Sequence, residues 1–141
     1  MVYCAVAGSS AERDITMSDI QIIQTEAAPA AIGPYSQGFF AGNFVLTSGQ
    51  IPVDPETGTV PEGITAQAEQ SCKNVSAVLQ AGGSDLSRVL KTTCFLRNMA
   101  DFAAFNEVYA AYFVSTPARS CVAVRDLPKG VLCEIEAIAV R

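Results

Sequence analysis

A change in the spacing of apolar residues near Thr65 constrains the fold of this chain most strongly. Before this point, short apolar runs alternate with stretches rich in Gly, Pro and Asn, which is typical of strands joined by turns. From Ala68 to Leu79 the apolar side chains recur every three or four residues, which predicts an amphipathic helix. Thr65 is the expected N-cap of this helix, and Gly82 and Gly83 are its expected C-terminal stop.

Aromatic residues predict a second helix further along the chain. Between Phe102 and Tyr112 they fall at positions i, i+3, i+7 and i+10, on one helical face. Asp101 or Asn98 can cap this helix, and Pro117 prevents its extension. Strands are expected at residues 19–24, 38–50 (a hairpin with its turn at 41–43), 88–96 and on both sides of 126–130, where the last two most simply form an antiparallel pair.

The resulting order of elements is β-β-β-α-β-α-β-β, with no internal repeat and no linker. Because helices and strands interleave without strict βαβ alternation, we expect an α+β fold with one mixed sheet and two α-helices on one face. Residues 17–141 are expected to form a single domain, and residues 1–16 an N-terminal extension. Half of the residues are hydrophobic and only 16% are charged, so we expect the other face of the sheet to be covered by self-association.

The composition excludes several kinds of site. The chain has no histidine, which excludes a Ser-His-Asp triad and every zinc site built on histidine. Its net charge is −5 and its basic residues are scattered, so nucleic acid is not an expected partner. No apolar run reaches the ~18 residues of a membrane span. The five cysteines form no CxxC pair, so we expect reduced thiols and a cytoplasmic protein, with an organelle as the alternative.

Charged residues interrupt the last two strand-like runs. Arg119 opens the first run, and Glu134 and Glu136 lie inside the second. The two glutamates share one face of a strand and lie ~6.5–7 Å apart along it, at two rises of the chain. A charge on a half-buried strand is costly unless it has a partner or a task.

The register of the two runs decides whether Arg119 and Glu134 share a face. Pairing of Arg125 with Val131 puts them on opposite faces, whereas pairing of Arg125 with Gly130 puts them on one face. A bulge or a contact between subunits could also bring them together. Taken alone, Arg119 is typical of a solvated surface charge.

Six longer segments carry a more specific signal than any single residue. They follow one another in order between residues 20 and 141, without a large gap. The segments are "APAAIGPYSQ" (28–37), "TSGQIPVDPETG" (47–58), "FNEVYAAYF" (105–113), "PARSCV" (117–122), "LPKG" (127–130) and "EIEAIAV" (134–140).

These segments resemble the signature of the RidA/YjgF family of reactive-intermediate deaminases. The resemblance implies a chorismate-mutase-like α+β fold, a homotrimer, and clefts between neighbouring subunits. It also implies hydrolysis of 2-imino and 2-enamino acids, such as 2-aminoacrylate and its imine tautomer 2-iminopropanoate, to 2-keto acids and ammonia. Residues 1–16 lie outside the family pattern, and the loop before Pro117 is a few residues shorter than in many members.

The resemblance also assigns roles to single residues of this chain. Arg119, in "PARSC", is implied to hold the substrate carboxylate, and Glu134, in "EIEAIA", to position or activate water. The residues implied to line the cleft are Tyr35, Ser48, Gly49, Asn106 and Cys121.

This set of residues suits the implied reaction. A guanidinium can grip a carboxylate through two parallel hydrogen bonds, and a carboxylate can serve water attack and proton transfer. Imines hydrolyse readily, so the reaction requires neither a metal nor a cofactor. Two alternatives stay open: a module that binds 2-keto acids or other small carboxylates without turnover, and an endoribonuclease or translation inhibitor, which the net charge disfavours.

Overall fold

The structure of this chain is a computed structural model that describes residue 16 and residues 19–141. The predicted extension, residues 1–16, lies outside the described residues apart from Thr16. The elements follow the predicted order: β1 (Ile20–Ile23), β2 (Gly38–Ala41), β3 (Phe44–Thr47), α1 (Ile64–Ala81), β4 (Val89–Leu96), α2 (Phe102–Tyr112), β5 (Ala118–Ala123) and β6 (Cys133–Val140).

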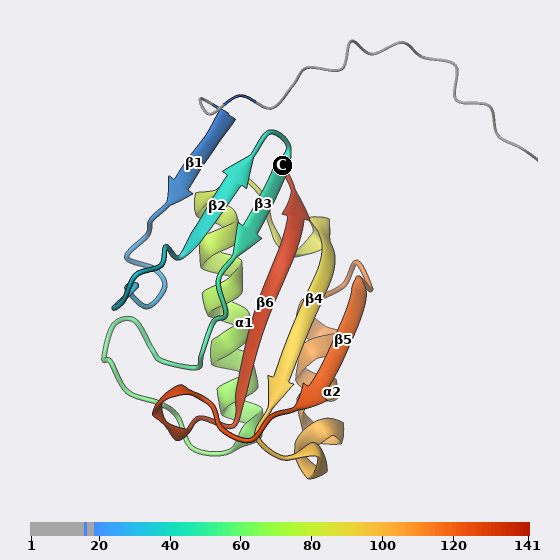
Figure 1. Ribbon diagram of the computed structural model, residues 1–141. Helices are drawn as coiled ribbons and strands as arrows, with labels where there is room; N and C mark the ends of the chain where they lie inside the picture. The colour runs from blue at the N-terminus through green and yellow to red at the C-terminus, as the bar shows by residue number, and fades with distance from the viewer. Residues whose placement is uncertain (1–15, 17–18) are drawn as a thin grey trace, which may run out of the picture.

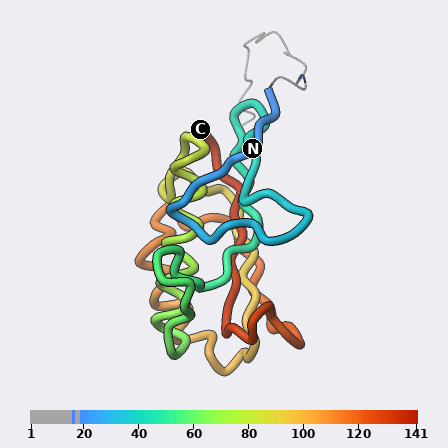
Figure 2. Tube along the Cα trace, turned by 90° about the vertical axis from the view of Figure 1, so that its left-hand side faces the viewer, coloured from blue at the N-terminus to red at the C-terminus, as the bar shows by residue number. Residues whose placement is uncertain are grey.

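The strands form one six-stranded sheet in the order β1-β2-β3-β6-β4-β5. All neighbouring strands run antiparallel except β4 and β5, which run parallel, so the sheet is mixed. Both helices lie behind this sheet in Figure 1, and Figure 2 shows them together on one side. The predicted α+β class, with two helices on one face of a mixed sheet, is confirmed.

The core lies between the sheet and the two helices. β6 contributes every second side chain to it, from Cys133 to Ala139, and each of these is at most 2% exposed. α1 buries the apolar stripe that its sequence spacing predicts. Burial raises the pKa of Cys94 and of Cys133 to about 12, so both thiols are protonated and serve as small apolar packing groups.

The predicted helix ends are partly correct. Thr65 is not the N-cap of α1, because the helix begins at Ile64 and its N-cap is Gly63, whose φ of 81° favours glycine. Gly82 ends the helix as predicted. Asn98 accepts a hydrogen bond from the N–H of Ala100, so of the two expected caps it is the one whose side chain caps the turn leading into α2.

The last two strands do not pair with each other, contrary to the prediction. β4 lies between β5 and β6, running parallel to β5 and antiparallel to β6. Residues 126–130 therefore form a crossing connection and not a hairpin turn. The sequence between two strands reports only that the chain turns, whereas the neighbour of each strand depends on contacts distant in sequence. β6 is buried at alternate positions because only one of its faces packs against the helices.

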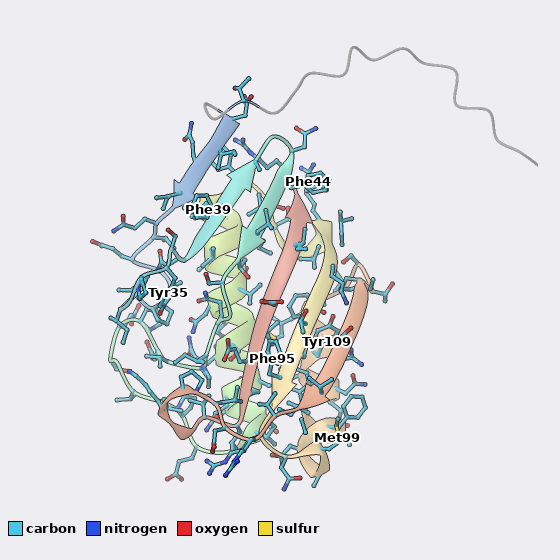
Figure 3. All side chains as sticks on the ribbon, in the orientation of Figure 1. Tyr35, Phe39, Phe44, Phe95, Met99 and Tyr109 are labelled. Carbon is cyan, nitrogen blue, oxygen red and sulfur yellow. The ribbon has the colours of Figure 1, made fainter. Side chains whose placement is uncertain are left out.

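The side of the sheet that faces away from α1 and α2 is called here the helix-free face. Its apolar side chains include Phe39 and Phe44, labelled in Figure 3, together with Ile22, Leu46 and Val122. Each of these five is between 38% and 62% exposed in the single chain. Four of these side chains lie together on β1, β2 and β3, whereas Val122 lies on the edge strand β5.

Candidate functional site

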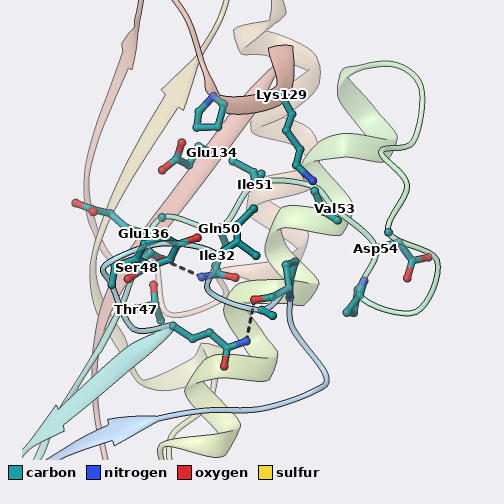
Figure 4. A pocket seen from close by; sticks show the side chains of 18 residues that line it. Ile32, Thr47, Ser48, Gln50, Ile51, Val53, Asp54, Lys129, Glu134 and Glu136 are labelled. Atoms are coloured by element: carbon teal, nitrogen blue, oxygen red, sulfur yellow. Dashed lines mark hydrogen bonds between the residues drawn. The ribbon is translucent and has the colours of Figure 1, made fainter.

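A cavity of about 850 Å³ opens on the helix-free face, at the end of the sheet where β3 stops and β6 begins. Loops 27–37 and 124–132 flank it, and Figure 2 shows the first of these loops projecting away from the helices. Four residues implied by the family resemblance line this cavity: Tyr35, Ser48, Gly49 and Glu134. Ser48 and Glu134 are labelled in Figure 4.

A β-bulge shapes the floor of the cavity. Regular pairing of β3 with β6 stops at Leu46 opposite Ile138, and an isolated bridge resumes at Gln50 opposite Ile135. Three residues of one strand therefore face two of the other, which bends the chain outward. The "TSGQ" segment folds in this way, and the bulge brings its backbone up to the side chains of β6.

The loop that carries Tyr35 is fixed to the bulge by hydrogen bonds. Ser48 donates from its backbone N–H to the carbonyl of Gln37 at 2.9 Å and from its hydroxyl to the carbonyl of Ser36 at 2.5 Å. The buried side chain of Gln37 in turn donates to the carbonyls of Ala28 and Pro29. The loop is long and rich in Ala and Pro, yet it has a defined position beside the cavity.

A buried asparagine of α1 holds the opposite wall. The side-chain amide of Asn74, which is 0% exposed, donates to the carbonyls of Ile51 and Val53, each at 2.9 Å. Gln70 donates to the Oδ1 of Asn74, so all the polar atoms of this side chain are paired. α1 thus fixes the loop after the bulge from behind.

Glu134 is the acid at the centre of the cavity floor. It is half-buried and lies beside Gly49, where a Cβ atom would stand only 2.8 Å from its Cδ. Burial raises the pKa of Glu134, and the charge of Glu136 on the same face raises it further. The side chains of Glu134 and Glu136 both line the cavity (Figure 4). A carboxyl with a raised pKa exchanges protons more readily near neutral pH than an ordinary one.

Arg119 lies elsewhere, packed against α2. Its Nη1 donates to the Oδ1 of Asn106 at 2.7 Å. Its guanidinium lies over the ring of Tyr109, 4.6 Å from the centroid, and 5.5 Å from that of Phe102. Cys121, two residues further along β5, packs against the same side of the sheet, and burial raises the pKa of its thiol.

Arg119 and Glu134 lie on opposite faces of the sheet in one chain, because β5 and β6 each pair with β4 and neither of the two expected registers between them applies. Arg119 pairs with Thr92, which pairs with Ala137, and Thr92 and Ala137 are both buried against the helices. Glu134 pairs with Phe95 on the helix-free face, three residues away from Ala137. Side chains at odd separation along a strand point to opposite faces.

The structure therefore divides the predicted site residues into two groups. The acid group, which lines the cavity, consists of Tyr35, Ser48, Gly49 and Glu134. The arginine group, which lies between β5 and α2, consists of Asn106, Arg119 and Cys121.

The sequence analysis gave no role in the site to several further residues of these groups. Glu136, which the strand spacing had placed on the same face as Glu134, also lines the cavity. Lys129 lines it too, from the "LPKG" turn, where its backbone is left-handed (φ 56°). Tyr109 and Phe102 were predicted only as a helical packing face.

The described residues have no group of three or more His, Cys, Asp or Glu side chains placed to hold a metal ion. Over the same part of the chain, neither helix combines the length and the apolar character that crossing a membrane requires.

The fold and the cavity define the class of the protein: a small α+β domain with a half-buried acid on one side of its sheet and a fixed arginine on the other. The family model described as Endoribonuclease L-PSP matches residues 25–141. The chain belongs to this family, which is the RidA/YjgF family that the sequence segments predicted.

Curated and solved relatives agree with this assignment. The 2-iminobutanoate/2-iminopropanoate deaminase of Salmonella typhimurium is 55% identical over 123 residues, which are 84% of this chain and 96% of the relative. The crystal structure of the YjgF gene product of Escherichia coli is 53% identical, with a TM-score of 0.83, and covers 86% of this chain and 98% of that one. TdcF of E. coli, solved with bound serine, is 50% identical with a TM-score of 0.83, at the same coverage of both chains.

Proposed function

We propose that this chain is a deaminase that hydrolyses small 2-imino acids, and their 2-enamino tautomers such as 2-aminoacrylate, to 2-keto acids and ammonia. The observation that carries the proposal is the pair of charged groups: a half-buried acid with a raised pKa in a cavity, and an arginine that Asn106 holds in place. The deaminase names of relatives at 54–55% identity support it. The cytoplasm stays the expected compartment.

The active site is completed between subunits of a homotrimer. In one chain Arg119 and Glu134 face opposite sides of the sheet, so a single chain cannot apply both to one small substrate. The exposed apolar side chains of the helix-free face, beside the cavity, support its burial by a neighbouring subunit. A neighbouring subunit packed there can bring the Arg119 of its own edge strand, β5, to the opening of the cavity.

Arg119 binds the substrate carboxylate. Asn106 uses one N–H of the guanidinium, and four of the five donors remain. Two of these match the two oxygens of a carboxylate, which fixes the plane of the substrate and therefore the position of its C2 atom. Charge-assisted hydrogen bonds are each worth about 1.5–3 kcal/mol, which is enough to select for acids.

Glu134 serves the water that attacks C2. The ionised carboxylate accepts a proton from water as the oxygen adds to the C=N carbon and returns this proton to nitrogen, which gives a tetrahedral amino alcohol. The carboxylate then takes the proton of the new hydroxyl group and passes it to nitrogen, so the C–N bond breaks as the C=O bond forms, and ammonia and the 2-keto acid leave. Proton transfer by a positioned carboxyl typically contributes ~10²–10⁴-fold to a rate.

The test is keto-acid and ammonia release from 2-iminobutanoate and 2-aminoacrylate, each generated in situ by an amino-acid dehydratase. We expect Arg119→Ala and Glu134→Gln each to lower kcat/KM by about 100-fold or more, because each removes one of the two charged groups. Arg125→Ala, at an exposed arginine six residues along the chain, is the matched control and keeps the wild-type rate.

Intact activity in Arg119→Ala would contradict the role given to the arginine. Binding of 2-oxobutyrate without acceleration of deamination would instead identify a carboxylate-binding module. RNA binding with a steep dependence on salt would identify the nucleic-acid activity that the family description names.

A further inference from the structure

α2 does more than pack against the sheet, because one of its faces holds the guanidinium of Arg119. Phe102, Asn106 and Tyr109 are spaced at i, i+4 and i+7, so they form one face of α2, and the guanidinium of Arg119 lies on that face. Asn106 fixes one edge of the guanidinium by a hydrogen bond, and the two rings contact its plane. Cation–π contact with a tyrosine or phenylalanine ring holds a guanidinium in one orientation.

Of these three residues, Tyr109 is the most firmly held. Its side chain is 7% exposed, and its ring stacks on Phe113 with a centroid distance of 4.4 Å. Its hydroxyl is 2.6 Å from the Oγ1 of the buried Thr92. Thr92 is also the residue that pairs with Arg119 between β4 and β5.

These contacts form a closed circuit of three links. The backbone of Arg119 pairs with Thr92, the hydroxyl of Thr92 bonds to the hydroxyl of Tyr109, and the ring of Tyr109 lies under the guanidinium of Arg119. The backbone of Arg119 and the guanidinium at the end of its side chain are thus both held, directly or through Tyr109, by Thr92 of β4. A tyrosine needed only for the core would also pair its buried hydroxyl, but it would not need the cation above its ring.

We propose that Tyr109 is a positioning residue for Arg119, which orients the guanidinium before the substrate carboxylate arrives. This inference rests on the proposed function of Arg119 as the carboxylate anchor. A free arginine side chain must lose rotational freedom to form two parallel hydrogen bonds, whereas one already held over a ring loses less. Tyr109 does not touch the substrate, and it acts through Arg119 alone.

The test compares Tyr109→Leu, which removes the ring, with Tyr109→Phe, which keeps the ring and removes only the hydroxyl. For Tyr109→Leu we expect KM, and the dissociation constant of 2-oxobutyrate measured by calorimetry, to rise by about 10-fold, while kcat changes by less than about 3-fold. Tyr109→Phe keeps both constants within about 3-fold of the wild-type values, because the ring stays under the guanidinium.

Phe105→Leu is the control for damage to the core. Phe105 lies on the same helix and is 0% exposed, and its ring centroid is 6.0 Å from that of Tyr109. This variant lowers the melting temperature while KM stays unchanged. If Tyr109→Leu does not fold, Phe102→Leu removes the second ring from a half-buried position, and KM rises by about 3-fold.

A folded Tyr109→Leu with the KM and the 2-oxobutyrate affinity of the wild type overturns the inference, as does an equal rise of KM in Phe105→Leu. These outcomes differ from failure of the proposed function. If Arg119→Ala abolishes binding and Tyr109→Leu leaves it intact, the anchor stands and only the role of Tyr109 is lost. If Arg119→Ala itself binds 2-oxobutyrate normally, the anchor is wrong and Tyr109 has nothing to position.

Discussion

At the scale of single residues, Glu134 shows how a functional group can oppose stability. Burial and the charge of Glu136 raise the pKa of Glu134 in the folded chain above its value in the unfolded chain. Between these two pKa values the folded state binds more protons, so the free energy of unfolding falls as the pH rises through this window. Above it, the ionised carboxylate destabilises the fold.

Glu134→Gln should therefore stabilise the protein at pH 7 while it lowers activity. The neutral amide avoids the cost of a half-buried charge beside Glu136. We expect a higher melting temperature than the wild type at pH 7, and a difference that vanishes near pH 3, where the wild-type carboxyl is protonated in both states. Glu56→Gln, at an exposed turn, is the control with little effect. A lower melting temperature for Glu134→Gln at pH 7 would contradict this account.

Gly49 is required because the Glu134 carboxylate occupies the space of a side chain. A Cβ at position 49 would overlap this carboxylate. We expect Gly49→Ala to push Glu134 out of position and to lower kcat by about 10-fold or more, since small displacements of reacting groups have large effects on rate. Gly42→Ala, where a Cβ would meet nothing within 4 Å but the φ of 57° strains an alanine, controls for a general loss of stability and retains kcat. Unchanged kcat in Gly49→Ala would show that Glu134 adapts freely.

At the scale of elements, local patterns predicted each helix and strand but not every neighbour. The helical spacing after Thr65, the glycine stop at Gly82 and the hairpin at 38–50 all follow from interactions within a few residues. The place of β4 between β5 and β6 does not, because it depends on contacts across the whole domain. The bulge in "TSGQ" was also beyond local reasoning, since it exists only relative to β6.

Asn74 links α1 to the loop that forms one wall of the cavity, so substitution of Asn74 should destabilise the fold. Asn74→Ala leaves the carbonyls of Ile51 and Val53 without their buried donor. We expect the free energy of unfolding, measured by urea titration, to fall by about 2–3 kcal/mol. Gln80→Ala, at an exposed position of the same helix, changes it by less than about 0.5 kcal/mol. Equal effects of the two substitutions would show that the hydrogen bonds of the buried Asn74 amide do not stabilise the fold.

At the scale of the whole molecule, the sequence did not predict how the proposed site residues are distributed over the fold. The segment resemblance pointed to Arg119, Glu134 and Asn106; the structure places Arg119 against Asn106 and Glu134 in the cavity, and the roles given to them stay predictions. The resemblance could not reveal that one chain holds Arg119 and Glu134 on opposite faces of its sheet. That fact depends on the register of β4 with both of its neighbours.

Because the proposed homotrimer packs on the helix-free face, we expect a charge there to separate the subunits and to abolish the proposed activity. Leu46 is 38% exposed at the middle of this face. We expect light scattering to give three times the chain mass for the wild type and the mass of one chain for Leu46→Lys, with loss of deaminase activity. Val114→Lys, at a 65% exposed position after α2, remains a trimer. A fully active monomer would contradict a site shared between subunits.

Complementation between two inactive variants tests the shared site most directly. Arg119→Ala and Glu134→Gln chains are mixed in equal amounts, unfolded and refolded together, and their deaminase activity is compared with that of the wild type. If each site takes its arginine from one subunit and its acid from the next, about one quarter of the sites in the mixture are intact, and about a quarter of the wild-type rate returns. If both groups act within one chain, every site lacks one of them, and the mixture stays as inactive as either variant alone.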